Sequence, residues 1–179
     1  MRFRVTRASA DDLDILVSHR LKMWADIRPQ AKSKVRDHEG VTRSWIRAKL
    51  AEGKLVGFII RAPHGGVAGS GCVWVREEQP RPGSPGLEVP YLMSMYTEKP
   101  YRRKGVAKLV VKGALRWCRD HKFETVVLHA SREGRPLYES LGFEPTSEMR
   151  RKLRPARSHR GSSRSSPMGG TFLLQRSDE

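Results

Sequence analysis

A basic segment with a single glycine is the part of the chain best suited to binding phosphates. It consists of Arg102, Arg103, Lys104, Gly105, Val106 and Ala107. The first N–H groups of a helix have no backbone partner and carry partial positive charge, which suits a phosphate when a turn leads into the helix. Gly105 allows a positive φ or a close backbone approach. We predict a phosphate-binding loop, and on this segment alone a solvated basic turn stays open as the alternative.

Two better-known phosphate loops do not fit this segment. No Lys-Ser or Lys-Thr pair follows Gly105, as a Walker A sequence requires. The glycine pattern of a dinucleotide-binding loop is also missing.

The flanking elements would position this loop. Residues 91–97 form a short apolar and aromatic run between Pro90 and Pro100, typical of a buried strand. A helix over residues 103–121 is predicted from apolar and small residues at helical spacing: Val106, Leu109, Val110, Gly113, Ala114 and Trp117. If a strand over residues 123–130 runs parallel to the first one, the helix is a right-handed crossover.

The other elements are predicted from the same patterns. Gly69 and Gly71 mark a bulge or a close approach within one strand. Strands are expected at residues 2–7, 55–60, 67–75 and 143–152, and helices at residues 9–28, 38–51 and 131–141. Residues 28–38 are expected to be a loop, and residues 77–86 a connector rich in proline and glycine.

A second motif follows the loop about 25 residues later. After the strand at residues 125–131 come Tyr138, Glu139, Gly142 and Phe143 in a Tyr-Glu-x-x-Gly-Phe pattern. Together with the Arg-x-x-Gly-x-Ala pattern of residues 102–107, this motif resembles the GNAT-type N-acetyltransferases. The resemblance is clear over residues 91–149 and extends less distinctly to Arg2.

The resemblance implies an α/β GNAT fold over residues 1–153. This fold has a mixed, mostly antiparallel central sheet that splays at a parallel strand pair and is flanked by about four helices. Acetyl-CoA would lie in the split, with its phosphates on residues 102–107. Residues 154–179 are rich in Ser, Arg and Gly, and this composition predicts a disordered basic tail.

The resemblance also assigns residue roles in acetyl transfer to a primary amine by direct attack. A backbone N–H near Met95 or Tyr96 would stabilise the carbonyl oxygen. Tyr138 would protonate the departing thiolate, unless it only packs on its helix. Ser131 stands where many members have an Asn that holds the pantetheine arm of the cofactor, so Ser131 is a candidate contact.

The base that deprotonates the amine is less defined. Glu88, just before the central strand, is the first candidate and His129 the second. A loop carboxylate, a hydrogen-bonded core histidine and a water chain are the alternatives. The family's first helical region lines the acceptor pocket, so Asp26 and His19 could face substrate or simply be exposed helix residues.

The net charge of +16, from 35 Lys and Arg against 19 Asp and Glu, suits anionic ligands. It also leaves open a basic nucleic-acid-associated protein, although the tail lacks interleaved aromatic residues and no helix-turn-helix or RNP pattern is present. A noncatalytic acyl-CoA-binding domain is the other alternative. The acceptor cannot be identified from sequence. Monomer and homodimer both stay open, since members of the family often dimerise.

The two cysteines, Cys72 and Cys118, have no metal or redox spacing and are interpreted as small buried hydrophobic residues. We therefore expect no metal cofactor. No apolar run is long enough to span a membrane, and the first residues lack the apolar core of a signal peptide. A cytoplasmic protein is the expectation.

Overall fold

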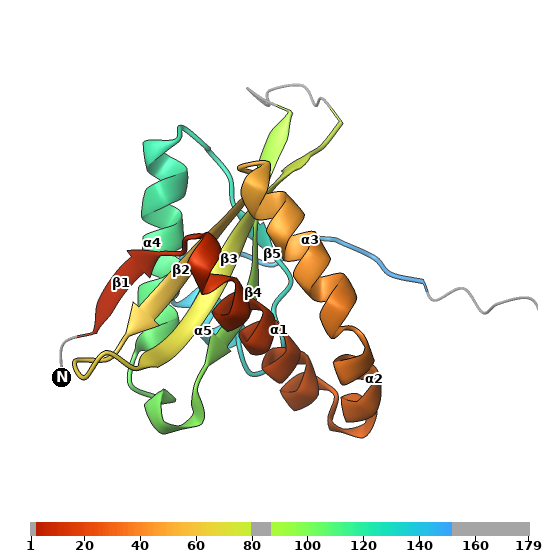
Figure 1. Cartoon of the computed structure of the whole chain (residues 1–179). Coiled ribbons are helices and arrows are strands. Elements are labelled where there is room, and N and C mark those ends of the chain that lie inside the picture. The colour runs from red at the N-terminus through yellow and green to blue at the C-terminus, as the bar shows by residue number, and fades with distance from the viewer. Residues whose placement is uncertain (1–2, 80–86, 152–179) are drawn as a thin grey trace, which may run out of the picture. The chain divides into compact units, whose positions relative to one another are not determined.

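The structure is a computed structural model that describes residues 3–79 and 87–151 (Figure 1). Its contacts divide the chain into two units, Met1–Glu144 and Pro145–Glu179. In the second unit, residues 145–151 form neither helix nor strand, so the predicted strand over residues 143–152 is wrong for the part described. Pro145 has no N–H to donate to a sheet. The predicted tail, residues 154–179, and its boundary after Leu153 lie outside the described residues.

The described part of the first unit contains a five-stranded mixed sheet in the order β1-β2-β3-β4-β5. Its strands are β1 (Arg4–Arg7), β2 (Leu55–Arg61), β3 (Val67–Glu77), β4 (Glu88–Thr97) and β5 (Val127–Leu128). Neighbouring strands from β1 to β4 are antiparallel, and β4 and β5 are parallel. The predicted fold class is therefore confirmed.

The helices are close to their predicted places, with one exception. They are α1 (Leu13–Ile27), α2 (Lys32–Asp37), α3 (Glu39–Ala51), α4 (Val106–Asp120) and α5 (Arg135–Glu139). The expected loop over residues 28–38 instead contains a 3-10 helix, Pro29–Ala31, and α2. Proline favours the first turn of a helix, and this segment is too polar to show an apolar stripe, so the sequence pattern missed it.

Helices cover both faces of the sheet (Figure 1). On one face, α1 and α3 pack through Leu16, Val17 and Ile46 against β2 and β3. On the other, α4 packs through a continuous stripe against all the long strands. The stripe consists of Val106, Val110, Val111, Ala114 and Cys118. Among the described helices, none is long and apolar enough to cross a membrane.

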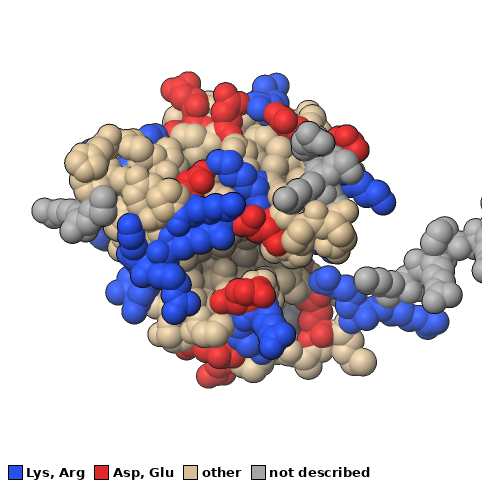
Figure 2. All heavy atoms as spheres, turned by 90° about the horizontal axis from the view of Figure 1, so that it is seen from below, with Lys and Arg blue, Asp and Glu red and all other residues tan. Residues whose placement is uncertain are grey.

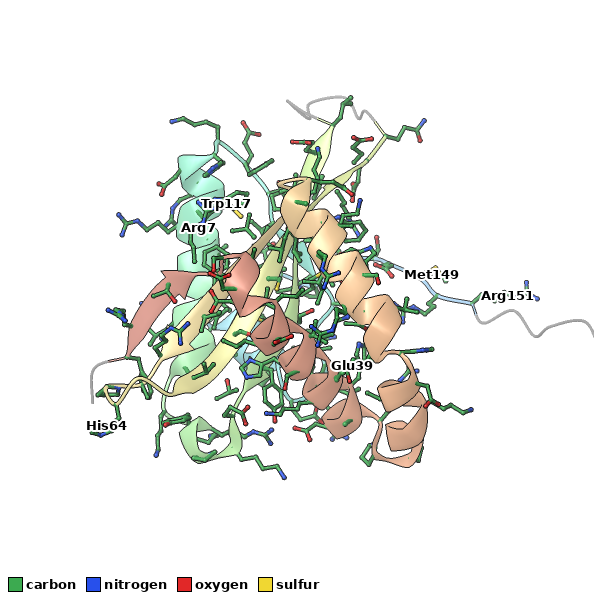
Figure 3. All side chains as sticks on the ribbon, in the orientation of Figure 1. Arg7, Glu39, His64, Trp117, Met149 and Arg151 are labelled. Carbon is green, nitrogen blue, oxygen red and sulfur yellow. The ribbon has the colours of Figure 1, made fainter. Side chains whose placement is uncertain are left out.

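Helix α4 also covers the edge of the sheet at β1. The Arg7 guanidinium lies 5.9 Å from the Trp117 ring centre, and both side chains point toward one another in Figure 3. A Cβ on Gly113 would lie 3.2 Å from Cγ1 of Val5, so the small residue allows β1 to approach the helix. This packing fixes the axis of α4, and thereby the direction of its N-terminus.

Candidate active site

The parallel strands β4 and β5 pair at only two positions among the described residues. Tyr91 pairs with Val127 and Leu92 with Leu128, whereas β4 continues to Thr97. The predicted strand over residues 123–130 is thus much shorter than expected. Beyond Leu92, this side of β4 has no neighbour in the sheet, which opens a split between the two strands. Ligands in open α/β sheets bind outside the carboxyl ends of strands, which is where this split lies.

A β-bulge lies in β4 within the split. Ser70 pairs with Tyr96 and Cys72 with Met93, so Ser94 and Met95 together oppose the single residue Gly71. Ser94 has a φ of 55°, which is uncommon outside glycine. A bulge leaves a residue without a regular ladder partner and re-aims the side chains around it. Backbone N–H groups near Met95 and Tyr96, the predicted oxyanion donors, are therefore at an irregular position of the strand.

The bulge also exchanges the faces on which β4 side chains lie. Met93 packs with the α1–α3 side, and Met95, two residues later, packs with the α4 side. A Cβ on Gly71 would lie 2.4 Å from Sδ of Met95 and 2.7 Å from Cγ1 of Val110. A Cβ on Gly69 would be similarly close to its neighbours, 2.7 Å from the Tyr96 carbonyl oxygen and 2.8 Å from Cγ1 of Val106. Both glycines are close-approach sites, as their sequence suggested.

The basic loop leads from β4 into α4. Gly105 directly precedes the helix with a φ of 80°, and Arg103 has a φ of 61°. Leu109 N–H donates to the Gly105 carbonyl at 3.1 Å, which is the first hydrogen bond of the helix. The N–H groups of the residues just before Leu109 are therefore not used by the hydrogen bonds of the helix itself. A Cβ on Gly105 would meet nothing within 4 Å, so the space in front of this N-terminus is open. The loop therefore has the form of an anion cradle, and its donors fit a diphosphate.

Not every residue of the predicted loop faces this space equally. Val106 is 1% exposed and belongs to the core, so only its main chain is available. Arg103 and Lys104 are exposed, and the Lys104 ammonium lies 5.9 Å from the Tyr101 ring. Figure 2 shows a hollow on one face of the molecule, with Lys and Arg side chains and some acidic ones around its rim.

Arg102 is already engaged with helix α1. Its Nη2 donates to Oδ2 of Asp26 at 2.5 Å, and its Nε donates to the Thr97 carbonyl at 3.1 Å. The guanidinium also lies 5.6 Å from the Tyr96 ring centre. Arg102 thus ties the loop to α1 and to the end of β4, and part of its charge is neutralised by Asp26.

His19 links α1 to β3 and to the residue that follows β4. Its Nδ1 lies 2.8 Å from Oγ of Ser70, and its Nε2 lies 3.3 Å from Oε1 of Glu98, which also pairs with Lys22. Burial lowers the pKa of His19, against the opposing effect of the Glu98 carboxylate. At 3% exposure, His19 is a core residue of the network rather than an open contact for substrate.

Arg20 forms a third link, which the sequence analysis missed. Its Nη1 donates to Oγ of Ser94 at 2.9 Å, directly at the bulge. Three of the polar α1 residues with such contacts recur at helical spacing, His19, Lys22 and Asp26, and Arg20 follows His19 by one residue. This polar stripe beside the apolar face was the signal in the sequence.

Tyr138 lies on α5, 9% exposed, with its ring 5.8 Å from that of Phe143. Burial, and to a lesser extent Tyr91, raises the pKa of Tyr138 to about 12. Its phenol is therefore protonated at neutral pH and available as a hydrogen-bond donor. Tyr138 packs in the core cluster that contains Leu92 and Leu128, the last paired residues of β4 and β5.

The two candidate bases lie in different places. His129, just after β5, has its Nδ1 2.5 Å from the Tyr91 hydroxyl. Glu88 is the first residue of β4 and forms an ion pair with Lys54. It precedes Met95 by seven strand positions, or about 23 Å. The structure does not bring Glu88 to the bulge, because no carboxylate side chain spans that distance, and its role as the base stays a prediction.

Ser131 accepts hydrogen bonds from residues that follow it closely in the chain. Its Oγ accepts a hydrogen bond from Gly134 N–H at 3.1 Å, and its carbonyl accepts one from Arg135 N–H at 3.0 Å. The side chain therefore shapes the turn into α5 and thereby positions Tyr138. Its hydroxyl hydrogen stays available for another acceptor.

Comparison with known proteins shows which family has this fold. The sequence profile of the Acetyltransferase (GNAT) family matches residues 13–143. The chain belongs to this GNAT acetyltransferase family. Among curated proteins no match is found.

Solved GNAT structures share the fold. A GCN5-related N-acetyltransferase from Ralstonia eutropha JMP134 is 24% identical with a TM-score of 0.78, covering 85% of this chain and 99% of its own. A "predicted acetyltransferase" from Clostridium acetobutylicum, solved with acetyl-CoA, is 24% identical with a TM-score of 0.75 over 88% and 99% of the two chains. Glucosamine-6-phosphate N-acetyltransferase from Arabidopsis thaliana is 17% identical, with a TM-score of 0.54 over 86% and 99%.

Proposed function

We propose that this GNAT protein transfers an acetyl group from acetyl-CoA to a primary amine by direct attack. The observation that carries the proposal is the open cradle formed by Gly105 and the N-terminus of α4, next to the split between β4 and β5. Membership of an acetyltransferase family and the acetyl-CoA held by the Clostridium acetobutylicum neighbour support it.

The loop would hold the diphosphate of acetyl-CoA. Main-chain N–H groups around Gly105 and the positive end of α4 supply most of the attraction. Arg103 and Lys104 add charge at the surface, whereas Arg102 is shared with Asp26. The pantetheine arm would enter the split, and Ser131 is placed at the turn that follows β5.

The bulge in β4 would stabilise the reacting carbonyl. An irregular strand position exposes N–H groups that a regular ladder would use, and Met95 and Tyr96 lie there. Preorganised donors aimed at a developing oxyanion are typically worth about 3–4 kcal/mol of barrier. Acetyl-CoA itself supplies the activated acyl group as a thioester.

Tyr138 would donate its hydroxyl hydrogen to the departing thiolate. With a pKa of about 12 it stays protonated over the working pH range, so the donor is always present. The amine must lose a proton before it attacks. With Glu88 placed at the far end of β4, His129 with its Tyr91 partner is the base we propose. Direct transfer requires no metal, and no cluster of metal-binding side chains occurs within residues 3–79 and 87–151.

The test is acetyl-CoA turnover with a panel of amines. Free thiol release reports CoA formation, and mass spectrometry of the amine reports the acetyl product. The proposal expects thiol release that depends on at least one amine, matched by a mass gain of one acetyl group. Acetyl-CoA binding without transfer to any amine would support a noncatalytic acyl-CoA-binding domain instead.

A further inference from the structure

Arg20 is a partly buried residue of α1 whose side chain reaches Ser94 at the bulge of β4. A guanidinium carries five N–H donors, and the described contact of Arg20 uses Nη1 for a bond to the neutral hydroxyl of Ser94. Within residues 3–79 and 87–151, no carboxylate forms an ion pair with it. Partly buried charges are usually paired, because losing water is costly for an ion.

The other partly buried arginines of this unit show the usual pattern. Arg61 pairs with Asp12 at 2.9 Å and Arg76 with Glu78 at 2.7 Å. Arg43 pairs with Asp14 and Glu39. Arg20 differs because its described hydrogen bond goes to the neutral hydroxyl of Ser94. Burial lowers the pKa of Arg20, as expected for a cation without a fixed counterion.

A second guanidinium donor is also unsatisfied on this side of the sheet. Arg76 lies 4.8 Å over the Tyr91 ring, and its buried Nε has no hydrogen-bond partner. Tyr91 is thus flanked by Arg76 and influenced by Arg20. The Arg20 guanidinium, with donors to spare, favours anionic oxygen groups in this region, and Arg76 adds positive charge over the Tyr91 ring.

From this arrangement we infer that the acceptor amine also carries an anionic group, a carboxylate or a phosphate, which Arg20 binds. The inference rests on the proposed acetyl transfer and names its substrate class. With the anion held at Arg20, an amine a few atoms away would be placed at the Ser94–Met95 bulge, where the carbonyl is stabilised. Polyamines, which are cations throughout, are expected to be repelled.

The test uses matched acceptors with the full chain and acetyl-CoA. Amino acids are compared with their carboxamides, aminoalkyl phosphates with the corresponding amino alcohols, and polyamines form a further arm. We expect at least a tenfold higher kcat/KM for the carboxylate or the phosphate member of a pair, and the arm that shows it identifies the anion. Higher values for neutral acceptors or polyamines would overturn the inference and leave acetyl transfer intact.

Substitutions of Arg20 and Ser94 separate two roles of Arg20, binding of the anionic acceptor and support of the bulge in β4. Arg20→Gln should reduce the preference to near onefold, mainly through KM of the anionic acceptor, and Arg20→Lys should restore part of it. Ser94→Ala removes the partner of Arg20 but not its charge, so the preference should persist. Arg61→Gln, whose pair with Asp12 lies elsewhere, is the matched control.

Three further outcomes have distinct meanings. Equal loss of preference in Ser94→Ala and Arg20→Gln would show that Arg20 only supports the strand, and would overturn the inference. Absence of acetyl-CoA binding in calorimetry would overturn the proposed function and this inference together. Unchanged preference in Arg20→Gln, with wild-type cofactor binding, would overturn the inference alone.

Discussion

Arg102 donates to Asp26 at 2.5 Å, so the first cation of the phosphate loop is bound to helix α1. The two side chains are 43% and 44% exposed, so the pair is open to solvent and to competition. An incoming diphosphate would find one loop cation already partly neutralised. We therefore expect Asp26 to influence the affinity of the loop for acetyl-CoA.

Asp26→Asn should therefore tighten CoA binding by roughly twofold to fivefold, because exposed pairs contribute about 0.2–1 kcal/mol. Isothermal titration calorimetry at low salt measures the change. Asp14→Asn is the charge-matched control, since Asp14 pairs with Arg43 on α3. Weaker CoA binding in Asp26→Asn would show instead that Asp26 holds Arg102 in its binding position.

Gly105→Glu should abolish cofactor binding. The substitution forces a side chain to a φ of 80° and places a carboxylate in the open cradle. Gly53→Glu is the matched control, because Gly53 has a φ of 69° and equally open space at the end of α3. Calorimetry that finds wild-type CoA affinity in folded Gly105→Glu would remove the loop from the cofactor site.

Tyr138→Phe should lower turnover at least tenfold, about 1.4 kcal/mol of barrier, and leave CoA affinity nearly unchanged. The phenol hydrogen is lost, while the ring keeps its packing against Phe143. Steady-state thiol release and calorimetry on the same preparation separate the two effects. Wild-type turnover would exclude Tyr138 as the acid.

Stability should fall below about pH 6.5 because of His19. Its pKa is lowered by burial, so the unfolded chain takes up a proton near pH 6.5 that the folded chain resists. The free energy of unfolding should decrease by up to about 1.4 kcal/mol per pH unit as pH falls. Urea titrations between pH 7.5 and 5.5 measure the slope.

His19→Gln should flatten that slope. His64→Gln is the control, since His64 lies in the exposed turn between β2 and β3 (Figure 3). Equal slopes in wild type and His19→Gln would mean that another group sets the pH dependence.

Gly71→Ala should destabilise the fold by about 1–3 kcal/mol, because its Cβ would overlap Met95 and Val110. Gly40→Ala, with open space inside α3, should stabilise it by about 0.5–1 kcal/mol. Thermal or urea unfolding of both variants measures the two changes in the free energy of unfolding. A neutral Gly71→Ala would mean that β4 and α4 move apart readily.

The strand, loop and helix around Gly105 could be predicted because each signal is local. A glycine, a cluster of cations and the apolar spacing of α4 all lie within one stretch of sequence. The bulge could not be predicted, since it depends on two residues of β4 opposing Gly71 of β3. Ser94, a non-glycine residue with positive φ, carries no local sign of that conformation.

The polar contacts of α1 could not be predicted from the sequence for a related reason. His19, Arg20 and Asp26 contact residues more than 50 positions away, so their partners appear only once the sheet has formed. Glu88 shows how position along a strand affects such a prediction. It looked close to the site because it begins the central strand, but an extended strand separates its ends by its whole length.

A crystal structure of the complex with acetyl-CoA tests the central claim most directly. The account predicts diphosphate oxygens about 2.7–3.2 Å from main-chain nitrogens of the loop at Gly105, with the thioester in the split beside Met95. A diphosphate bound elsewhere, or a cradle left empty at saturating acetyl-CoA, would contradict it.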